Sequence, residues 1–199
     1  MSRESIWTFL KTHTALPDTA VAGIMGNIEA ESQCESCRFR GDATDGRLPS
    51  RTYAKLVNNG SISAEVFAAD PKDWGLCQWG GKKRRLALHE FCMSRGKGID
   101  DEETQIEFML DEMQNHYPGL WLRLLTAGDV RAVTELVCRV YERPAVENMQ
   151  YRLDWAQRIY NRFHGTPVSA SGKKSVSGSL VKAFCRAVGA KLRRVLSIW

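Results

Sequence analysis

The sequence of 199 residues lacks any apolar run close to the roughly 20 residues that span a bilayer, so no transmembrane helix is expected. Its N-terminus has no basic stretch followed by a long apolar core, and we therefore expect no secretory signal peptide. The four histidines are scattered singly, and Cys34 and Cys37 are the only close pair among six cysteines. Because a zinc site needs a second pair of cysteines or two nearby histidines, we expect free thiols and neither a metal nor another cofactor.

Acidic residues are missing from the end of the chain. Residues 165–199 contain seven lysines and arginines and no acid, whereas residues 1–164 contain 21 basic and 23 acidic residues, a net charge of −2. The overall charge of +5 therefore comes from the tail. Binding of nucleic acid would rest on this charge alone, since no recognition motif is present, and we expect no specific nucleic-acid partner.

The residues that are present are typical of a globular chain, with 43% apolar and 26% charged residues in a length that suits one domain and an appendage. Apolar residues recur at helical spacing through most of the chain. Residues 38–50 read as a polar loop, and 73–79 is the one segment expected to be extended or strand-like. The fold class is predicted to be mainly α, with a small β element. Helices are predicted over 3–13, 17–32, 51–58, 63–69, 82–95, 101–115, 118–126, 129–142 and 146–163.

Three segments are expected along the chain: a helical domain over 1–164, a Ser/Gly/Lys-rich flexible linker over 165–179, and an amphipathic helix over 180–199. On the last helix, basic residues cluster opposite a wide apolar arc, although Lys191 falls on the apolar side. This pattern suits a helix that lies in a membrane interface, and it also suits packing against a protein surface.

Two short segments carry residues that could do chemistry. The first ends a predicted helix and reads Gly-Asn-Ile-Glu-Ala-Glu-Ser, with Glu29 and Glu31 beside an apolar face. The second, some 45 residues later, reads Gly-Leu-Cys-Gln-Trp and contains Gln78. A carboxyl group at the C-terminal end of a helix, next to apolar residues, is favoured in its protonated form. Such a group can act as a general acid near neutral pH, but helical geometry alone does not separate Glu29 from Glu31.

In this order the segments resemble the lysozyme superfamily, which includes goose-type lysozymes and soluble lytic transglycosylases, and they resemble most closely the phage tail lysozyme domain. The resemblance covers roughly 6–164 and says nothing of 165–199. Its motifs are Ala22-Gly23-Ile24-Met25-Gly26-Asn27, Ala30-Glu31-Ser32, Gly41-Asp42, Tyr53, Gly75-Leu76-Cys77-Gln78-Trp79 with Arg84-Arg85, and Glu142-Arg143-Pro144.

The resemblance implies a lysozyme-like, all-helical domain that cleaves the β-1,4 bond between N-acetylmuramic acid and N-acetylglucosamine in peptidoglycan. Glu31 occupies the position of the family's catalytic Glu and is therefore predicted to be the general acid, in preference to Glu29. The alternatives are a lytic transglycosylase that acts on the same bond and a module of the same fold that only binds glycan or another virion protein.

Three further residues are predicted to bind substrate. Gln78 can both donate to and accept from the N-acetyl and hydroxyl groups of an amino sugar. Trp79 could offer a flat apolar face to a sugar ring, and a place in the core is an equally good interpretation. Tyr53 is included because it matches the family's tyrosine.

The second catalytic group is less well defined. Asp42 matches the family's Gly-Asp and is the candidate, while Asp45 and Asp73 are further acids near the two segments. Water needs a carboxylate to activate it, whereas a transglycosylase uses the sugar's own 6-hydroxyl group as nucleophile. For Glu142 and Arg143 we favour an ion pair that locks the C-terminal helices over a contact with substrate.

The expected site of action follows from the same resemblance. The protein is predicted to be made in the bacterial cytoplasm and to act at the cell wall or in the periplasm, with a role in the virion also open. The basic helix over 180–199 is predicted to bind anionic membrane or wall surfaces and so to bring the enzyme to peptidoglycan.

Overall fold

The computed structural model describes residues 2–39 and 48–167. The chain divides into two units, Met1–Val168 and Ser169–Trp199, and the second lies outside the described residues, as does the predicted helix over 180–199. Asp42 and Asp45 also lie outside them. The helices are α1 (Arg3–His13), α2 (Asp18–Ser32), α3 (Ser50–Asn58), α4 (Ala64–Ala69), α5 (Lys82–Ser94), α6 (Glu102–Asn115), α7 (Pro118–Leu125), α8 (Val130–Val137), the π-helical turn η1 (Cys138–Glu142) and α9 (Met149–Phe163).

The structure confirms the mainly α fold class. Across residues 2–39 and 48–167 there is no strand, and the only β features are isolated antiparallel bridges that pair Trp74 with Phe39 and with Trp79. The segment expected to be extended is therefore a tight turn. None of the described helices has the length and apolar character that a membrane span requires.

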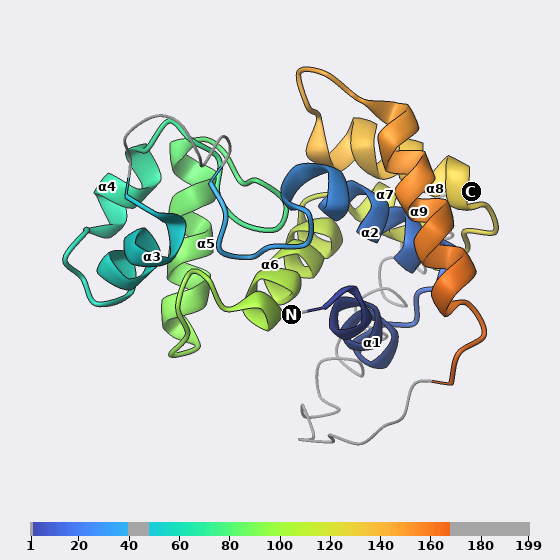
Figure 1. Cartoon of the computed structure of the whole chain (residues 1–199), viewed down its shortest axis with the longest axis horizontal. Coiled ribbons are helices and arrows are strands. Elements are labelled where there is room, and N and C mark those ends of the chain that lie inside the picture. The colour runs from blue at the N-terminus through green and yellow to red at the C-terminus, as the bar shows by residue number, and fades with distance from the viewer. Residues whose placement is uncertain (1, 40–47, 168–199) are drawn as a thin grey trace, which may run out of the picture. The chain divides into compact units, whose positions relative to one another are not determined.

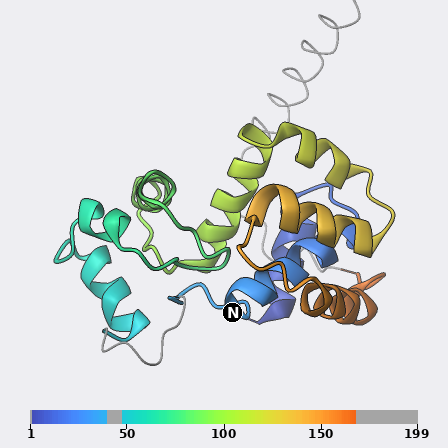
Figure 2. The ribbon, with the colours of Figure 1, turned by 90° about the horizontal axis from the view of Figure 1, so that it is seen from above.

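Within the first unit, α6 runs between two groups of helices (Figures 1 and 2). The group formed by α3, α4 and α5 lies on one side of α6, and the group formed by α1, α2, α8 and α9 lies on the other. Helix α4 packs against α5 in the first group, and α2 packs against α8 and α9 in the second. The C-terminal end of α2 is thereby brought next to α9, although more than 100 residues separate them in the sequence.

Helix α2 is the central helix of its group. The sequence suggests a single apolar face, but every residue of α2 from Ala20 to Glu29 is buried, because neighbours cover all sides of the helix. Two glycines allow this close packing: a Cβ atom at Gly23 would overlap the Val133 side chain of α8, and one at Gly26 would lie 2.6 Å from Ala156 Cβ of α9. The glycines of the first motif are thus explained by the approach of α8 and α9.

The turn that contains the second motif is fixed by hydrogen bonds on both sides. The Trp79 N–H donates to the Trp74 carbonyl oxygen at 2.8 Å, and the Trp74 N–H donates in return at 3.1 Å. Gly75 has a φ of +81°, and a Cβ atom there would lie 2.7 Å from the Gln105 side chain, so this position requires glycine. The Gly75 N–H also donates to the Arg38 carbonyl oxygen at 2.9 Å, which ties the turn to the chain that follows α2.

Candidate active site

Glu31 lies in the last turn of α2, and its side chain is 12% exposed. Its Oε1 accepts a hydrogen bond from Nη2 of Arg152 on α9 at 2.5 Å. Arg152 is almost fully buried and is held from two further directions, because it donates to Asn27 Oδ1 at 3.0 Å and to the Glu147 carbonyl oxygen at 2.8 Å. The Glu31 carboxylate is therefore oriented by a guanidinium that is itself rigidly placed.

Two cavities meet at Glu31. A cavity of about 250 Å³ is lined by Glu31, Asp73, Gln78, Gly80, Arg84, Glu142, Arg143, Pro144 and Ala145. A cavity of about 420 Å³ is lined by Ala30, Glu31, Arg38, Pro144, Val146, Asn148 and Arg152. Glu31 and Pro144 belong to both, so an extended ligand that passes from one cavity into the other would pass the Glu31 carboxyl group.

Glu29, the competing acid of the first motif, lies elsewhere. It is 1% exposed, and its two carboxylate oxygens accept hydrogen bonds from Arg3 of α1 at 2.6 and 2.9 Å. The Cys34 thiol also donates to it at 3.2 Å. Glu29 lines neither cavity and ties α1 to α2, which is a structural role.

Gln78 lines the smaller cavity, as the sequence predicts. Its side-chain amide nitrogen donates to the carbonyl oxygens of Gly75 at 2.7 Å and Arg38 at 3.2 Å. These two acceptors fix which end of the amide is which. The opposite atom, Oε1, is buried and has no hydrogen-bond partner among the described residues. The backbone of Gln78 is also held at a φ of +46°, a conformation that non-glycine residues rarely adopt.

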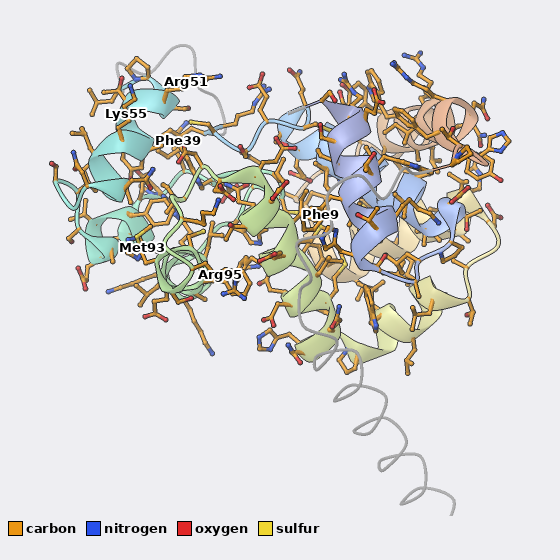
Figure 3. All side chains as sticks on the ribbon, turned by 90° about the horizontal axis from the view of Figure 1, so that it is seen from below. Phe9, Phe39, Arg51, Lys55, Met93 and Arg95 are labelled. Atoms are coloured by element: carbon orange, nitrogen blue, oxygen red, sulfur yellow. The ribbon has the colours of Figure 1, made fainter. Side chains whose placement is uncertain are left out.

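The structure places two of the residues predicted to bind substrate in the core. Trp79 is completely buried, and its Nε1 donates to Glu112 Oε2 of α6 at 2.8 Å, so it has no face open to a sugar ring. Tyr53 is also buried, in an aromatic cluster next to Phe39, which Figure 3 labels beside α3. Neither residue lines the cavities at Glu31. Both motif aromatics belong to the core, because the turn and α3 direct them inward.

Glu142 also lines the smaller cavity, which the sequence pattern did not indicate. Helix α8 was expected to continue to residue 142, but its last five residues form the π-helical turn η1, after which Arg143 adopts a left-handed conformation with a φ of +50°. The wider turn places the partly buried Glu142 in the cavity with Glu31. The Arg143 Nε donates to the Val140 carbonyl oxygen at 2.9 Å, and among the described residues no ion pair joins Arg143 to Glu142.

The electrostatics of Glu142 differ from those of an exposed acid. Burial, followed by the negative charge of Glu31, raises the pKa of Glu142 from 4.5 to about 8, although Arg84 and Arg152 oppose the shift. Both effects therefore favour the neutral form of the Glu142 carboxyl group in the cavity. Perturbed carboxyl groups in a cavity are typical of functional sites.

Several hydrogen bonds converge on one acidic side chain behind the smaller cavity. Glu112 of α6 accepts from Arg84 at 2.7 and 2.8 Å, from the Tyr141 hydroxyl at 2.6 Å and from Trp79. These bonds join α5, α6, η1 and the turn after Trp74 into one wall. The second motif therefore contributes to the site mainly by building this wall, with Gln78 as its cavity-facing residue.

The described residues contain no group of three histidine, cysteine or acidic side chains that could hold a metal ion. The acids at the site are instead paired with arginines: Glu31 with Arg152, and Glu112 with Arg84. The side chains of this arrangement can transfer a proton and stabilise charge.

Comparison with known proteins identifies the family of the chain. A search of curated proteins finds no match to the chain. A family model described as phage tail lysozyme matches residues 2–163, which include both cavities and every motif quoted above. The chain therefore belongs to the phage tail lysozyme family, with the lysozyme-like function on peptidoglycan that this family implies.

Proposed function

We propose that the protein cleaves the β-1,4 bond between N-acetylmuramic acid and N-acetylglucosamine, with Glu31 as the general acid. The observation that carries this proposal is the position of Glu31 where the two cavities meet. A glycan strand that occupies both cavities would place one glycosidic oxygen next to its carboxyl group. Glu29 cannot do so, because it is buried against Arg3 outside both cavities.

In this proposal a proton passes from the Glu31 carboxyl group to the glycosidic oxygen, and the bond from C1 to that oxygen breaks with its electron pair left on the oxygen. The Gln78 Oε1 atom, which lacks a partner in the described structure, can accept from a sugar hydroxyl or N-acetyl N–H group. Its amide is fixed by two carbonyl oxygens, so it is ready to bind without rearrangement.

The nucleophile decides between the two products. Hydrolysis needs a carboxylate that activates water, and Asp73 is the aspartate that shares the smaller cavity with Glu31. Asp42, which matches the family's motif, lies outside the described residues and remains the other proposed base. A lytic transglycosylase needs no base for water, because the 6-hydroxyl group of the muramic acid attacks C1 and leaves an anhydro sugar. We propose hydrolysis as the main reaction.

Loss of turbidity of purified peptidoglycan tests this function. The wild type is expected to clear the suspension, Glu31→Gln to leave it turbid, and the control Glu35→Gln, an exposed acid just past the end of α2, to match the wild type. A wild-type protein that binds the walls but releases no soluble sugar would contradict the proposal and favour a module that only binds glycan.

A further inference from the structure

Glu31 and Glu142 come from different elements and line one cavity. Glu31 belongs to the last turn of α2, and Glu142 is the final residue of η1. Both line the cavity of about 250 Å³ that also contains Gln78. The π-helical turn is what brings the second carboxyl group there, since an α-helix continued through this segment would rotate residue 142 to a different direction.

Charged and titratable groups surround Glu142 from every element packed against it. On the negative side they are Glu31 of α2 and Glu112 of α6, and on the positive side Arg84 of α5 and Arg152 of α9. Asp73 and Arg143 line the same cavity, and Tyr141 and Cys77 are buried neighbours.

The two arginines are already engaged by other acids. Arg152 donates to Glu31, and Arg84 makes two hydrogen bonds to Glu112. The attraction that they offer to a negative charge on Glu142 is therefore largely cancelled by the acids beside them. What remains is a partly buried carboxyl group next to a second one, and two such groups resist being ionised together.

We propose that Glu31 and Glu142 act as a proton-sharing pair, in which Glu142 is a positioning residue that keeps one proton in the cleft at neutral pH. This inference rests on the function proposed above for Glu31. Burial is the largest cause of the raised pKa of Glu142, which lies at about 8, and the negative charge of Glu31 is the second. The proton is therefore retained by the pair through the neutral range, even though Arg152 stabilises a negative charge on Glu31.

The pair accounts for how an acid that contacts an arginine can still deliver a proton. When the shared proton moves from Glu142 to Glu31 and from there to the glycosidic oxygen, both carboxyl groups are left negative beside the positively charged sugar, which stabilises that charge. As water or the 6-hydroxyl group attacks C1, its proton is released and can return to the pair directly or through a neighbouring base. The pair then holds one proton again, and the cycle is balanced.

The pH dependence of activity distinguishes this role from a structural one. Wild-type activity is expected to fall as the pH rises through about 8, where the pair loses its proton. In Glu142→Gln the carboxyl group with the raised pKa is gone, so the alkaline limb should move to lower pH. The variant should lose more than tenfold activity at pH 8 and recover to within about threefold of the wild type near pH 5.

Asp154→Asn is the matched control, because Asp154 is an exposed acid of α9 that accepts a hydrogen bond from the Gln150 side chain and lines neither cavity. It should keep the wild-type profile. A uniform loss of activity in Glu142→Gln at all pH values, with an unmoved alkaline limb, would overturn the proposal and leave Glu142 as a structural residue. Failure of the wild type on peptidoglycan would instead count against the proposed function.

A titration that does not depend on activity provides the second readout. The side-chain carboxyl carbon of Glu142, followed by NMR in isotopically labelled protein, should titrate at a lower pH in Glu31→Gln than in the wild type. The reason is that the substitution removes the negative charge that helps to keep Glu142 protonated. An identical titration in both proteins would show that the two carboxyl groups do not share a proton and would overturn the proposal.

Discussion

Arg152 of α9 contacts Glu31 of α2 at 2.5 Å, and this pair joins two helices that more than 100 residues separate in the sequence. The same guanidinium donates to Asn27, one helical turn before Glu31. It thus fixes the end of α2 and the carboxyl group together. The site depends on this geometry because a small displacement of a reacting group can cost orders of magnitude in rate.

Arg152→Lys is expected to impair catalysis. An ammonium group cannot replace three hydrogen bonds that diverge from one planar guanidinium, so the Glu31 carboxyl group should lose its orientation. We expect kcat/KM on peptidoglycan to fall by about 10- to 100-fold. Far-ultraviolet circular dichroism should show an unchanged helix content. Activity equal to that of the wild type would contradict an orienting role.

Glu29→Gln is expected to affect stability and spare the chemistry. The substitution removes the buried negative charge that Nε and Nη2 of Arg3 contact, and should lower the free energy of unfolding by about 1–3 kcal/mol. Below the melting transition the variant should retain most of its activity. Chemical denaturation measures the stability and a turbidity assay measures the activity. A Glu29→Gln variant that is inactive but fully stable would show that Glu29, and not Glu31, is the catalytic acid.

The raised pKa of Glu142 predicts how stability changes with pH. The neutral form of Glu142 is favoured more strongly in the folded protein, where the pKa is about 8, than in the unfolded chain, where the pKa is 4.5. This contribution to stability is fully present below pH 4.5 and is lost as the pH rises through 8. Glu142→Gln, which is always neutral, should therefore melt close to the wild type at pH 4.5 and at a higher temperature than the wild type at pH 9. A difference in melting temperature that stays constant with pH would contradict this.

The tail over 180–199 is expected from its sequence to bind anionic surfaces, and it lies outside the described residues. A chain that stops after Pro167 keeps the hydrogen bond from the Gly165 N–H to Asp18 and so preserves the end of the helical domain. We expect it to clear purified peptidoglycan like the full chain, while it binds vesicles that contain phosphatidylglycerol less tightly and kills intact cells less well. Loss of activity on purified peptidoglycan would show that the tail belongs to the folded domain.

The helices could be predicted because their signals are local, whereas only the resemblance to the family separated Glu31 from Glu29. Pro17 and the Cys-Glu-Ser-Cys stretch mark the ends of α2, and both ends agree with the structure to within a residue. The α9 helix begins three residues later than expected, because Asn148 adopts a left-handed conformation with a φ of +42°. Such a change of backbone direction leaves no periodic pattern in the sequence.

The roles of Trp79 and Glu142 could not be predicted from the sequence, because tertiary contacts determine them. Trp79 is adjacent to Gln78, yet its indole N–H points to Glu112, 33 residues away, so proximity in sequence did not indicate a shared surface. Glu142 reaches the cavity only because η1 is a π-helical turn, which apolar spacing does not reveal. The family's Glu-Arg-Pro motif was the one available signal that residue 142 has a function.

Mass spectrometry of the muropeptides that the protein releases from purified peptidoglycan is the sharpest test of Glu31 as the general acid of hydrolysis. We expect fragments that end in reducing N-acetylmuramic acid from the wild type and from Glu35→Gln, and a decrease in their release of about 10²- to 10⁴-fold for a folded Glu31→Gln variant. Anhydro ends would show that the protein is a transglycosylase and not a hydrolase. Reducing N-acetylglucosamine ends would show that it cleaves the other β-1,4 bond of the glycan. Release by Glu31→Gln at the wild-type rate would contradict Glu31 as the general acid.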